Sequence, residues 1–122
     1  MSKNIVSNDV YKWVSVDLPL EMTNMITYYT YNLRLIDPNK FISGSIENYI
    51  KCNCDDPEHI DIPEITLTHK IALKIYIPEL LLFKMMLVSF VAKVSLSSIT
   101  YEALRHSIPQ LVVMKQELEK SK

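Results

Sequence analysis

The sequence contains a single glycine among its 122 residues, and this scarcity excludes several classes of nucleotide enzyme. Loops that cradle the phosphates of a dinucleotide or a nucleoside triphosphate need several glycines, because their backbone must approach the ligand closely. The G-x-S-x-G elbow that presents a catalytic serine is also missing. The three histidines, His59, His69 and His106, stand in no motif that would aim them at a nucleophile. We therefore expect a protein without a catalytic site and without a cofactor.

Cysteine is almost as scarce. Cys52 and Cys54 stand in "KCNCDD", and His59 follows five residues later. Two thiolates and one imidazole, with Asp55 and Asp56 nearby, are ligand types that zinc accepts. Zinc sites more often use paired C-x-x-C motifs, so the pattern favours solvated loop residues and no metal. Reduced thiols agree with a cytoplasmic or nuclear location.

A strong excess of charge is missing as well, since the formal net charge is −1. Nucleic-acid binding by charge alone is therefore not expected. The longest apolar run, "IPELLLFKMMLVSFVAKV", is interrupted by Lys84 and Lys93, which leaves only eight residues between charges. A membrane span needs about 20 apolar residues. The start, "MSKNIVSNDV", lacks the apolar stretch of a signal peptide. These features predict a soluble cytoplasmic or nuclear protein that does not bind membranes.

Hydrophobic periodicity predicts the elements. Residues 11–18 alternate as a half-buried strand, and "LEMTNMITYYTYNLRL" repeats apolar residues at helical spacing. Residues 37–61, with the only glycine and two prolines, are predicted to be a long loop, whose middle, "SIENYIKCN", could form a short strand or a turn of helix. Residues 63–78 predict a hairpin, with "ITLT" in its first strand and Ile71–Ile77 in its second. Pro78 and Glu79 then begin a long helix.

The predicted fold class is α+β. It consists of a three-stranded antiparallel sheet with two helices packed on one face, in the order β-α-β-β-α, and a C-terminal helical tail over residues 105–122. The chain is expected to form one domain, residues 1–122, with its core in residues 11–104.

The long helix is apolar on two sides at about 100° per residue. One stripe consists of Leu80, Phe83, Leu87, Phe90, Val91 and Val94. The other consists of Leu81, Met85, Val88, Ala92, Leu96 and Ile99. Because the first stripe is bulkier, it is assigned to the core, which leaves Leu81, Met85, Val88 and Ala92 facing outward as partner-binding residues. The alternative is that the tail, with "SIPQLVVMKQELEK", folds back and covers the second stripe.

The first strand is expected to lie at an edge of the sheet. Its outward residues Trp13, Ser15 and Asp17 leave an alternating strand with a single charge in its middle, which is suited to pairing with a second chain. We therefore expect a homodimer, or a heterodimer with a small partner that pairs at this edge.

Two segments resemble a known family. "VSVDLPLEMTNMITYYTYNLRLIDP" has an apolar-Pro-apolar step from strand to helix and the Asp37-Pro38 step after the helix. The second segment has an acidic residue before an apolar-Thr-apolar strand, then an apolar run and an acidic start to a long helix. Its matching residues are Glu64, Ile65, Thr66, Leu67, Ile71 to Ile77, Glu79, Leu82, Phe83, Lys84, Leu87, Ser89 and Phe90. This order resembles the small dimerisation subunit of the KEOPS complex, the family that includes the CTAG/LAGE antigens. The resemblance covers residues 13–104 apart from the long loop.

The resemblance implies a non-catalytic scaffold. Such subunits pack two helices against helices of the threonylcarbamoyltransferase subunit, and they pair through the sheet with a second copy or a partner protein. The complex places threonylcarbamoyl on the adenosine next to the anticodon of tRNA, so tRNA would be met only through the complex. The alternative is a small viral matrix or assembly protein that self-associates, which the Asn-, Ile- and Lys-rich, glycine-poor composition also fits.

Overall fold

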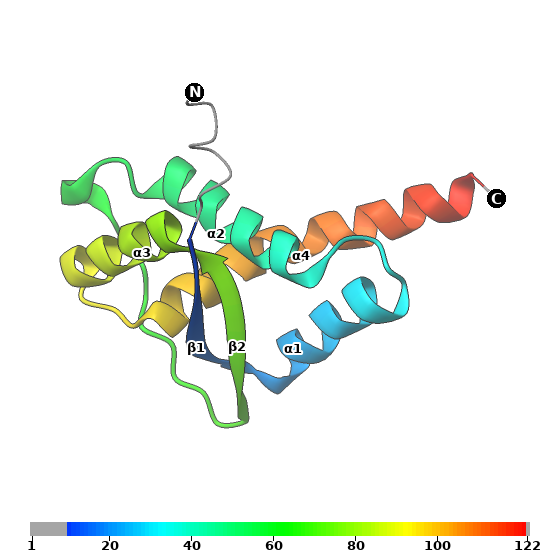
Figure 1. Cartoon of the computed structure of the whole chain (residues 1–122), viewed down its shortest axis with the longest axis horizontal. Coiled ribbons are helices and arrows are strands. Elements are labelled where there is room, and N and C mark those ends of the chain that lie inside the picture. The colour runs from blue at the N-terminus through cyan, green and yellow to red at the C-terminus, as the bar shows by residue number, and fades with distance from the viewer. Residues whose placement is uncertain (1–9, 122) are drawn as a thin grey trace.

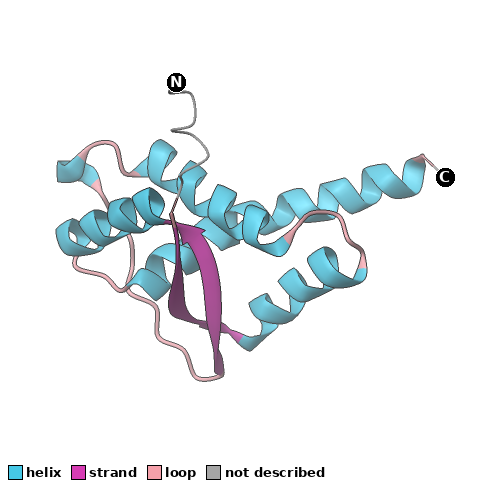
Figure 2. Cartoon of the chain, in the orientation of Figure 1, coloured by secondary structure: helices cyan, strands magenta, loops and turns pink. Residues whose placement is uncertain are grey.

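The computed structural model describes residues 10–121, which form two strands, four α-helices and two short helical turns (Figures 1 and 2). In chain order these are β1 (Tyr11–Pro19), α1 (Leu20–Thr27), the π-helical turn η2 (Tyr28–Asn32), α2 (Pro38–Asn53), the 3₁₀ turn η3 (Pro57–His59), β2 (Lys70–Pro78), α3 (Glu79–Ala92) and α4 (Leu96–Lys120).

The sheet is an antiparallel pair of β1 and β2. Trp13 lies opposite Tyr76, and Val14 lies opposite Ile75. Alternation places Val14, Val16 and Leu18 of β1 in the core beside the buried residues of β2, as the period of a strand requires. The prediction for residues 11–18 is confirmed.

The predicted three-stranded sheet is wrong, because the described chain holds two strands. "ITLT", residues 65–68, forms no strand, and β2 pairs with β1 instead of with its predicted hairpin partner. The N-terminus of α4 holds this segment: the Glu64 carboxylate accepts bonds from the Ser95 N–H, at 2.8 Å, and from the Ser95 and Ser98 hydroxyls, at 2.7 and 2.8 Å. The Ile65 N–H donates to Ser98 Oγ at 3.0 Å, so it is already used. The β-propensity of residues 65–68 is therefore overridden by these hydrogen bonds and by the pairing of β2 with β1.

The predicted loop over residues 37–61 is also wrong in its larger part, because residues 38–53 form α2. Asp37 caps this helix by accepting a bond from the Lys40 N–H at 3.1 Å, and Pro38 takes the first helical position. Five side chains at helical spacing are buried along it: Phe41, Ile42, Ser45, Ile46 and Tyr49. The lone glycine, Gly44, therefore lies inside a helix and not in a turn.

α3 and α4 are joined by a sharp turn. Lys93 takes the left-handed conformation that ends α3, and the axes of the two helices differ by 107°. α4 begins at Leu96, so residues 105–120 of the predicted tail are part of a longer helix that buries Ile99, Leu104, Ile108 and Leu111, whereas residue 122 lies outside the described residues. The core thus reaches beyond residue 104. Among residues 10–121, α3 and α4 together reach the length and apolarity of a membrane span, whereas neither does so alone.

The helices cover one face of the strand pair and lie beside its ends. α2 packs on α4 and on β2, and α4 packs on β1, so these two helices cover the inner face of the sheet (Figure 1). α1 and α3 lie on opposite sides of the strands, and each follows directly from a strand that ends in proline. The prediction of two helices on a three-stranded sheet is therefore wrong. The described chain has four α-helices and a two-stranded sheet whose outward face stays exposed, and α3 lies at the periphery of this arrangement.

Candidate protein interface

α3 is fixed to the sheet at its first turn. The Glu79 N–H donates to the Val10 carbonyl at 2.7 Å, and the Glu79 carboxylate lies 3.5 Å from the Lys12 ammonium. Pro78 precedes the helix without a side-chain cap. These contacts direct Glu79 outward and Leu81 inward, which sets the orientation of every later residue of the helix.

The inner face of α3 is formed by Leu81, Met85 and Val88, which are 3%, 0% and 6% exposed. Ala92 is partly buried against the same core. These four residues were predicted to face outward and to bind a partner; the predicted orientation is wrong. The stripe is covered by the chain's own core, to which α4 contributes Ile99. Residues 112–118 of the predicted tail take no part in this cover, because none of them is buried.

The outer face of α3 is apolar and exposed. Its six residues are Leu80, Phe83, Met86, Leu87, Phe90 and Val91, with exposed fractions of 75%, 59%, 57%, 53%, 83% and 44%. At about 100° per residue they fill an arc of about 140°, and Lys84 borders it. A surface helix normally turns polar residues to this side. Phe83, Leu87 and Phe90, assigned to the core from sequence, therefore form the most exposed apolar surface of a single helix in the described chain.

A groove extends the apolar surface beyond α3. It measures about 240 Å³ and lies between Leu87 and Val91 of α3 and Cys54, Pro57 and Ile60 of the segment after α2. Burial raises the pKa of the Cys54 thiol, and the nearby Asp55 carboxylate adds to the shift, so this sulfur stays a neutral thiol. The groove thus adds mainly apolar area along one border of the outer face, with Lys84 as its single charged lining residue.

The predicted dimer edge lies on the outward face of the sheet. Trp13 is 66% exposed, and its ring centroid lies 4.7 Å from that of Tyr76 on the opposite strand. Ser15 is exposed, and Asp17 lies 3.6 Å from the Lys70 ammonium. At the edge itself the Asp17 N–H donates to Ser97 Oγ at 2.8 Å, so α4 occupies part of it. Pairing of this strand with another chain stays a prediction.

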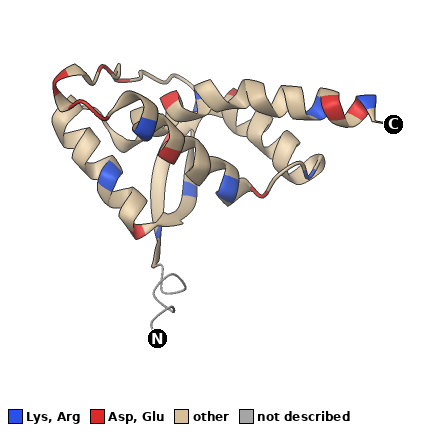
Figure 3. Ribbon diagram, turned by 90° about the horizontal axis from the view of Figure 1, so that it is seen from above, with Lys and Arg blue, Asp and Glu red and all other residues tan. Residues whose placement is uncertain are grey.

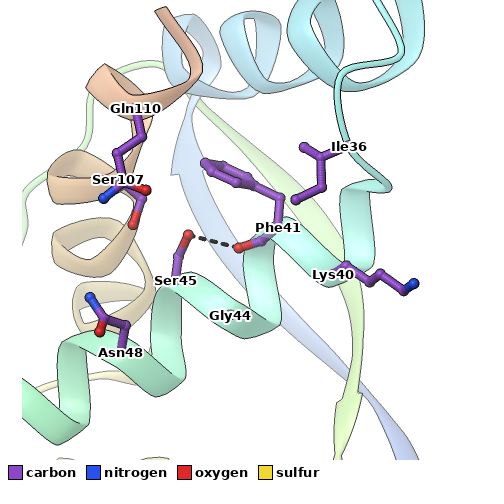
Figure 4. A pocket seen from close by; sticks show the side chains of 8 residues that line it. All are labelled: Ile36, Lys40, Phe41, Gly44, Ser45, Asn48, Ser107 and Gln110. Carbon is purple, nitrogen blue, oxygen red and sulfur yellow. Dashed lines mark hydrogen bonds between the residues drawn. The ribbon is translucent and has the colours of Figure 1, made fainter. Parts of the chain in front are cut away.

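A second depression lies between α2 and α4 (Figure 4). Its volume of about 320 Å³ is at the low end for ligand sites. Asn48, Ser107 and Gln110 supply polar groups, whereas the Ser45 hydroxyl donates to the Phe41 carbonyl at 2.7 Å and is already used. With Lys40 as its single charged lining residue, the depression offers no acid–base pair.

One cluster of titratable groups, on α2 and α4, forms structural contacts. The side chain of Glu102 is 8% exposed and accepts a bond from Arg105 at 2.9 Å, while His106 stacks on Tyr49 with ring centroids 5.5 Å apart. Burial, with a contribution from Glu102, raises the pKa of Tyr49 and keeps its phenol neutral.

The zinc ligands considered from sequence are not brought together. Cys52 is exposed, Cys54 is partly buried, and His59 Nδ1 lies 2.6 Å from Asp56 Oδ2. Over residues 10–121, no three cysteine, histidine or acidic side chains are grouped so that they could hold a metal ion.

Comparison with protein-family models, with curated proteins and with solved structures gave no match. The KEOPS resemblance therefore rests on the residue patterns alone. The lysine, arginine, aspartate and glutamate positions are spread along the described ribbon in the view of Figure 3. The outer face of α3 is thus the most distinctive surface of the described chain.

Proposed function

We propose that this chain is a non-catalytic interaction subunit that binds a helix of another polypeptide along the outer face of α3. The observation that supports it is the set of six neighbouring apolar side chains, each 44–83% exposed. Apolar surface of this extent on a protein marks an interaction site. Its shape is a straight stripe along one helix, which matches a second helix better than it matches a compact ligand.

The KEOPS resemblance gives this proposal one specific form, in which the partner is the threonylcarbamoyltransferase subunit and tRNA is met only through the complex. An exposed apolar helix agrees with binding to helices of a larger subunit. Charged positions spread along the described ribbon, as in Figure 3, fit a subunit that meets tRNA only through the complex. The observed sheet speaks against the KEOPS form of the proposal, because the resemblance implied three strands and the described chain has two.

A self-assembling structural protein is the second candidate. It is favoured by further exposed apolar residues away from α3. Tyr11, Trp13 and Tyr76 lie on the outward face of the sheet, and Val113 and Leu118 lie near the end of α4. Several separate contact surfaces suit repeated association into a lattice or filament, whereas a scaffold subunit would form one discrete complex.

The test uses the tagged full chain and two variants. Phe83→Asp places a charge on the outer face of α3, and Val113→Asp places one on α4, at positions 59% and 53% exposed. Proteins captured by the wild type, the mass of its assemblies and its binding to a purified threonylcarbamoyltransferase subunit are compared with those of each variant. We expect Phe83→Asp to lose the bound partner and Val113→Asp to keep it. Identical captured proteins and identical assemblies for all three chains would refute the proposal.

A further inference from the structure

The most regular part of the outer face is a row of four residues that we call the α3 seam: Leu80, Phe83, Leu87 and Phe90. Their separations are three, four and three residues, which is the a/d repeat of a coiled coil. All four are more than half exposed. In an isolated surface helix such a repeat has nothing to pack on, and in a coiled coil it packs on the same repeat of another helix.

We propose that the helix bound along the α3 seam is α3 of a second copy of this chain, lying antiparallel across a two-fold axis. This rests on the proposed function and names its partner. A two-fold contact requires a surface that is complementary to itself. The separations along the seam read the same in both directions, so an antiparallel copy meets it in register.

The layers of this contact are evenly filled. In an antiparallel pair, each a position packs beside a d position of the other helix. Leu80 then lies beside Phe90 of the second copy, and Phe83 lies beside Leu87. Every layer combines one leucine with one phenylalanine, so no layer is overfilled and none leaves a void. A parallel pair would instead place leucine on leucine and phenylalanine on phenylalanine.

The area agrees with a dimer. If a fully exposed large apolar side chain presents roughly 200 Å², the six residues of the outer face offer roughly 700 Å² per copy. A stable interface of standard size buries about 800 Å² per partner, and the largest apolar patch on a typical monomer is about 300–600 Å². The outer face with the bordering groove is therefore sufficient for a two-fold dimer.

Lys84 gives the contact a characteristic salt dependence. It follows Phe83 and borders the seam near its middle, so the two-fold axis brings the two Lys84 side chains to the same side of the pair. Their stems can cover the seam while the ammonium groups stay in water. Since like charges repel and salt screens them, association should tighten as ionic strength rises. A contact held by opposite charges would weaken.

The first measurement is sedimentation equilibrium of the full chain over a wide micromolar range, at low and high salt. Leu87→Asp is compared with Val113→Asp, because both positions are 53% exposed and only the first lies on the seam. We expect a wild-type dimer that tightens with salt. We expect Leu87→Asp to weaken association by at least about thirtyfold, the effect of losing an interface hot spot, and Val113→Asp to leave it unchanged.

The second measurement tests orientation by cross-linking in a Cys52→Ser, Cys54→Ser background. We expect a mixture of Leu80→Cys and Phe90→Cys chains to form the mixed disulfide on mild oxidation, because the antiparallel register brings these positions together. Leu80→Cys alone should not cross-link to itself. Self-cross-linking of Leu80→Cys, or a dimer that Leu87→Asp does not weaken, would overturn the proposed pair.

The remaining outcomes separate this inference from the proposed function. A wild-type chain that stays monomeric but captures another protein through Phe83 overturns the second copy as occupant and leaves the proposed function intact. Binding of the monomer to vesicles of anionic phospholipid through Phe90 overturns both, since the occupant would then be a membrane. A wild-type chain that forms no dimer and captures no partner also overturns both the proposed pair and the proposed function.

Discussion

Met85 and Phe90 lie five residues apart on α3 and face opposite environments, with exposed fractions of 0% and 83%. At the scale of single residues we therefore expect opposite responses to the same change. Met85→Asp should lower the free energy of unfolding by at least about 3 kcal/mol, because it buries an unpaired charge. Phe90→Asp should change it by less than about 0.5 kcal/mol in the monomer. Urea denaturation followed by circular dichroism, at low protein concentration, measures both.

Met85→Leu is the matched control, since it keeps the volume and should cost less than about 1.5 kcal/mol. Equal destabilisation by Met85→Asp and Phe90→Asp would mean that the outer face is covered within the chain, and the interface would not exist.

Glu64 is the second residue with a measurable role. Hydrogen bonds from Ser95, and then from Ser98, lower its pKa, so the folded state favours the carboxylate. A lowered pKa means stability that is present above the ordinary carboxyl pKa and is lost as pH falls through the folded value. Because Glu64 is exposed and solvent screens its carboxylate, Glu64→Gln should lower the free energy of unfolding by only about 0.5 kcal/mol near neutral pH. The difference should disappear in acid.

Urea denaturation of both chains at about pH 7 and about pH 3 tests this titration. Glu47→Gln, at an exposed position of α2, is the control and should change little at either pH. A difference between wild type and Glu64→Gln that persists unchanged in acid would show that the carboxylate is not the stabilising form.

Sequence periodicity found both stripes of α3 but not their orientation. Side-chain bulk was used to choose the inner stripe, whereas the backbone bond from Glu79 to Val10 and the direct step from β2 determine it. The Glu79–Val10 bond joins parts of the chain far apart in sequence, so no local pattern contains it. The three-four-three spacing of Leu80, Phe83, Leu87 and Phe90 was readable, and it was the available signal for an exposed helix-binding row.

At the scale of elements, α2 shows a local signal that was misread. Asp37 and Pro38 form a helix cap and first position, and Ile42, Ile46 and Tyr49 repeat at helical spacing. The glycine, the two prolines and the polar residues of 37–61 nevertheless indicated a loop. The missing strand at residues 65–68 is different. Its alternation is genuine, but a strand also needs a free partner edge, and that depends on the whole fold.

Gly44 tests the helical assignment of α2. A Cβ atom added there would meet nothing within 4 Å. Gly44→Ala should therefore raise the free energy of unfolding by about 0.5–1 kcal/mol, since alanine loses less backbone entropy in a helix. Gly44→Pro should lower it by about 3 kcal/mol or more. Thermal denaturation of the two variants checks this, and equal tolerance of alanine and proline would contradict a helix at this position.

The end of α3 can be tested in the same way. Lys93 has φ of 60° and ψ of 45°, a conformation that costs a residue with a Cβ about 1–2 kcal/mol. Lys93→Gly should raise the melting temperature, and Lys93→Ala should not, because alanine keeps the Cβ. A gain with alanine equal to that with glycine would point to removal of the lysine charge instead of relief of the backbone.

At the scale of the whole molecule, association and stability are linked. A partner that binds only the folded state stabilises it by mass action, so a dimer melts at a temperature that rises with protein concentration. We expect this dependence for the wild type and for Val113→Asp, and a much weaker dependence for Leu87→Asp. A hundredfold range of protein concentration changes the linked free energy by at most about 2.7 kcal/mol, which is enough for calorimetry to detect the shift in melting temperature. A concentration-independent wild type would contradict self-association.

α4 extends this picture beyond the contact itself. Figure 1 places α3 and the C-terminal end of α4 at opposite ends of the long axis, and Val113, Met114 and Leu118 are exposed after the last buried residue of the helix, Leu111. Two chains joined through α3 would hold two such helix ends on opposite sides, as a bivalent ligand. A target with two matching sites then gains an avidity of about 100- to 10,000-fold over a single contact. Because a helix and not a flexible linker sets the separation, targets with a different spacing gain nothing.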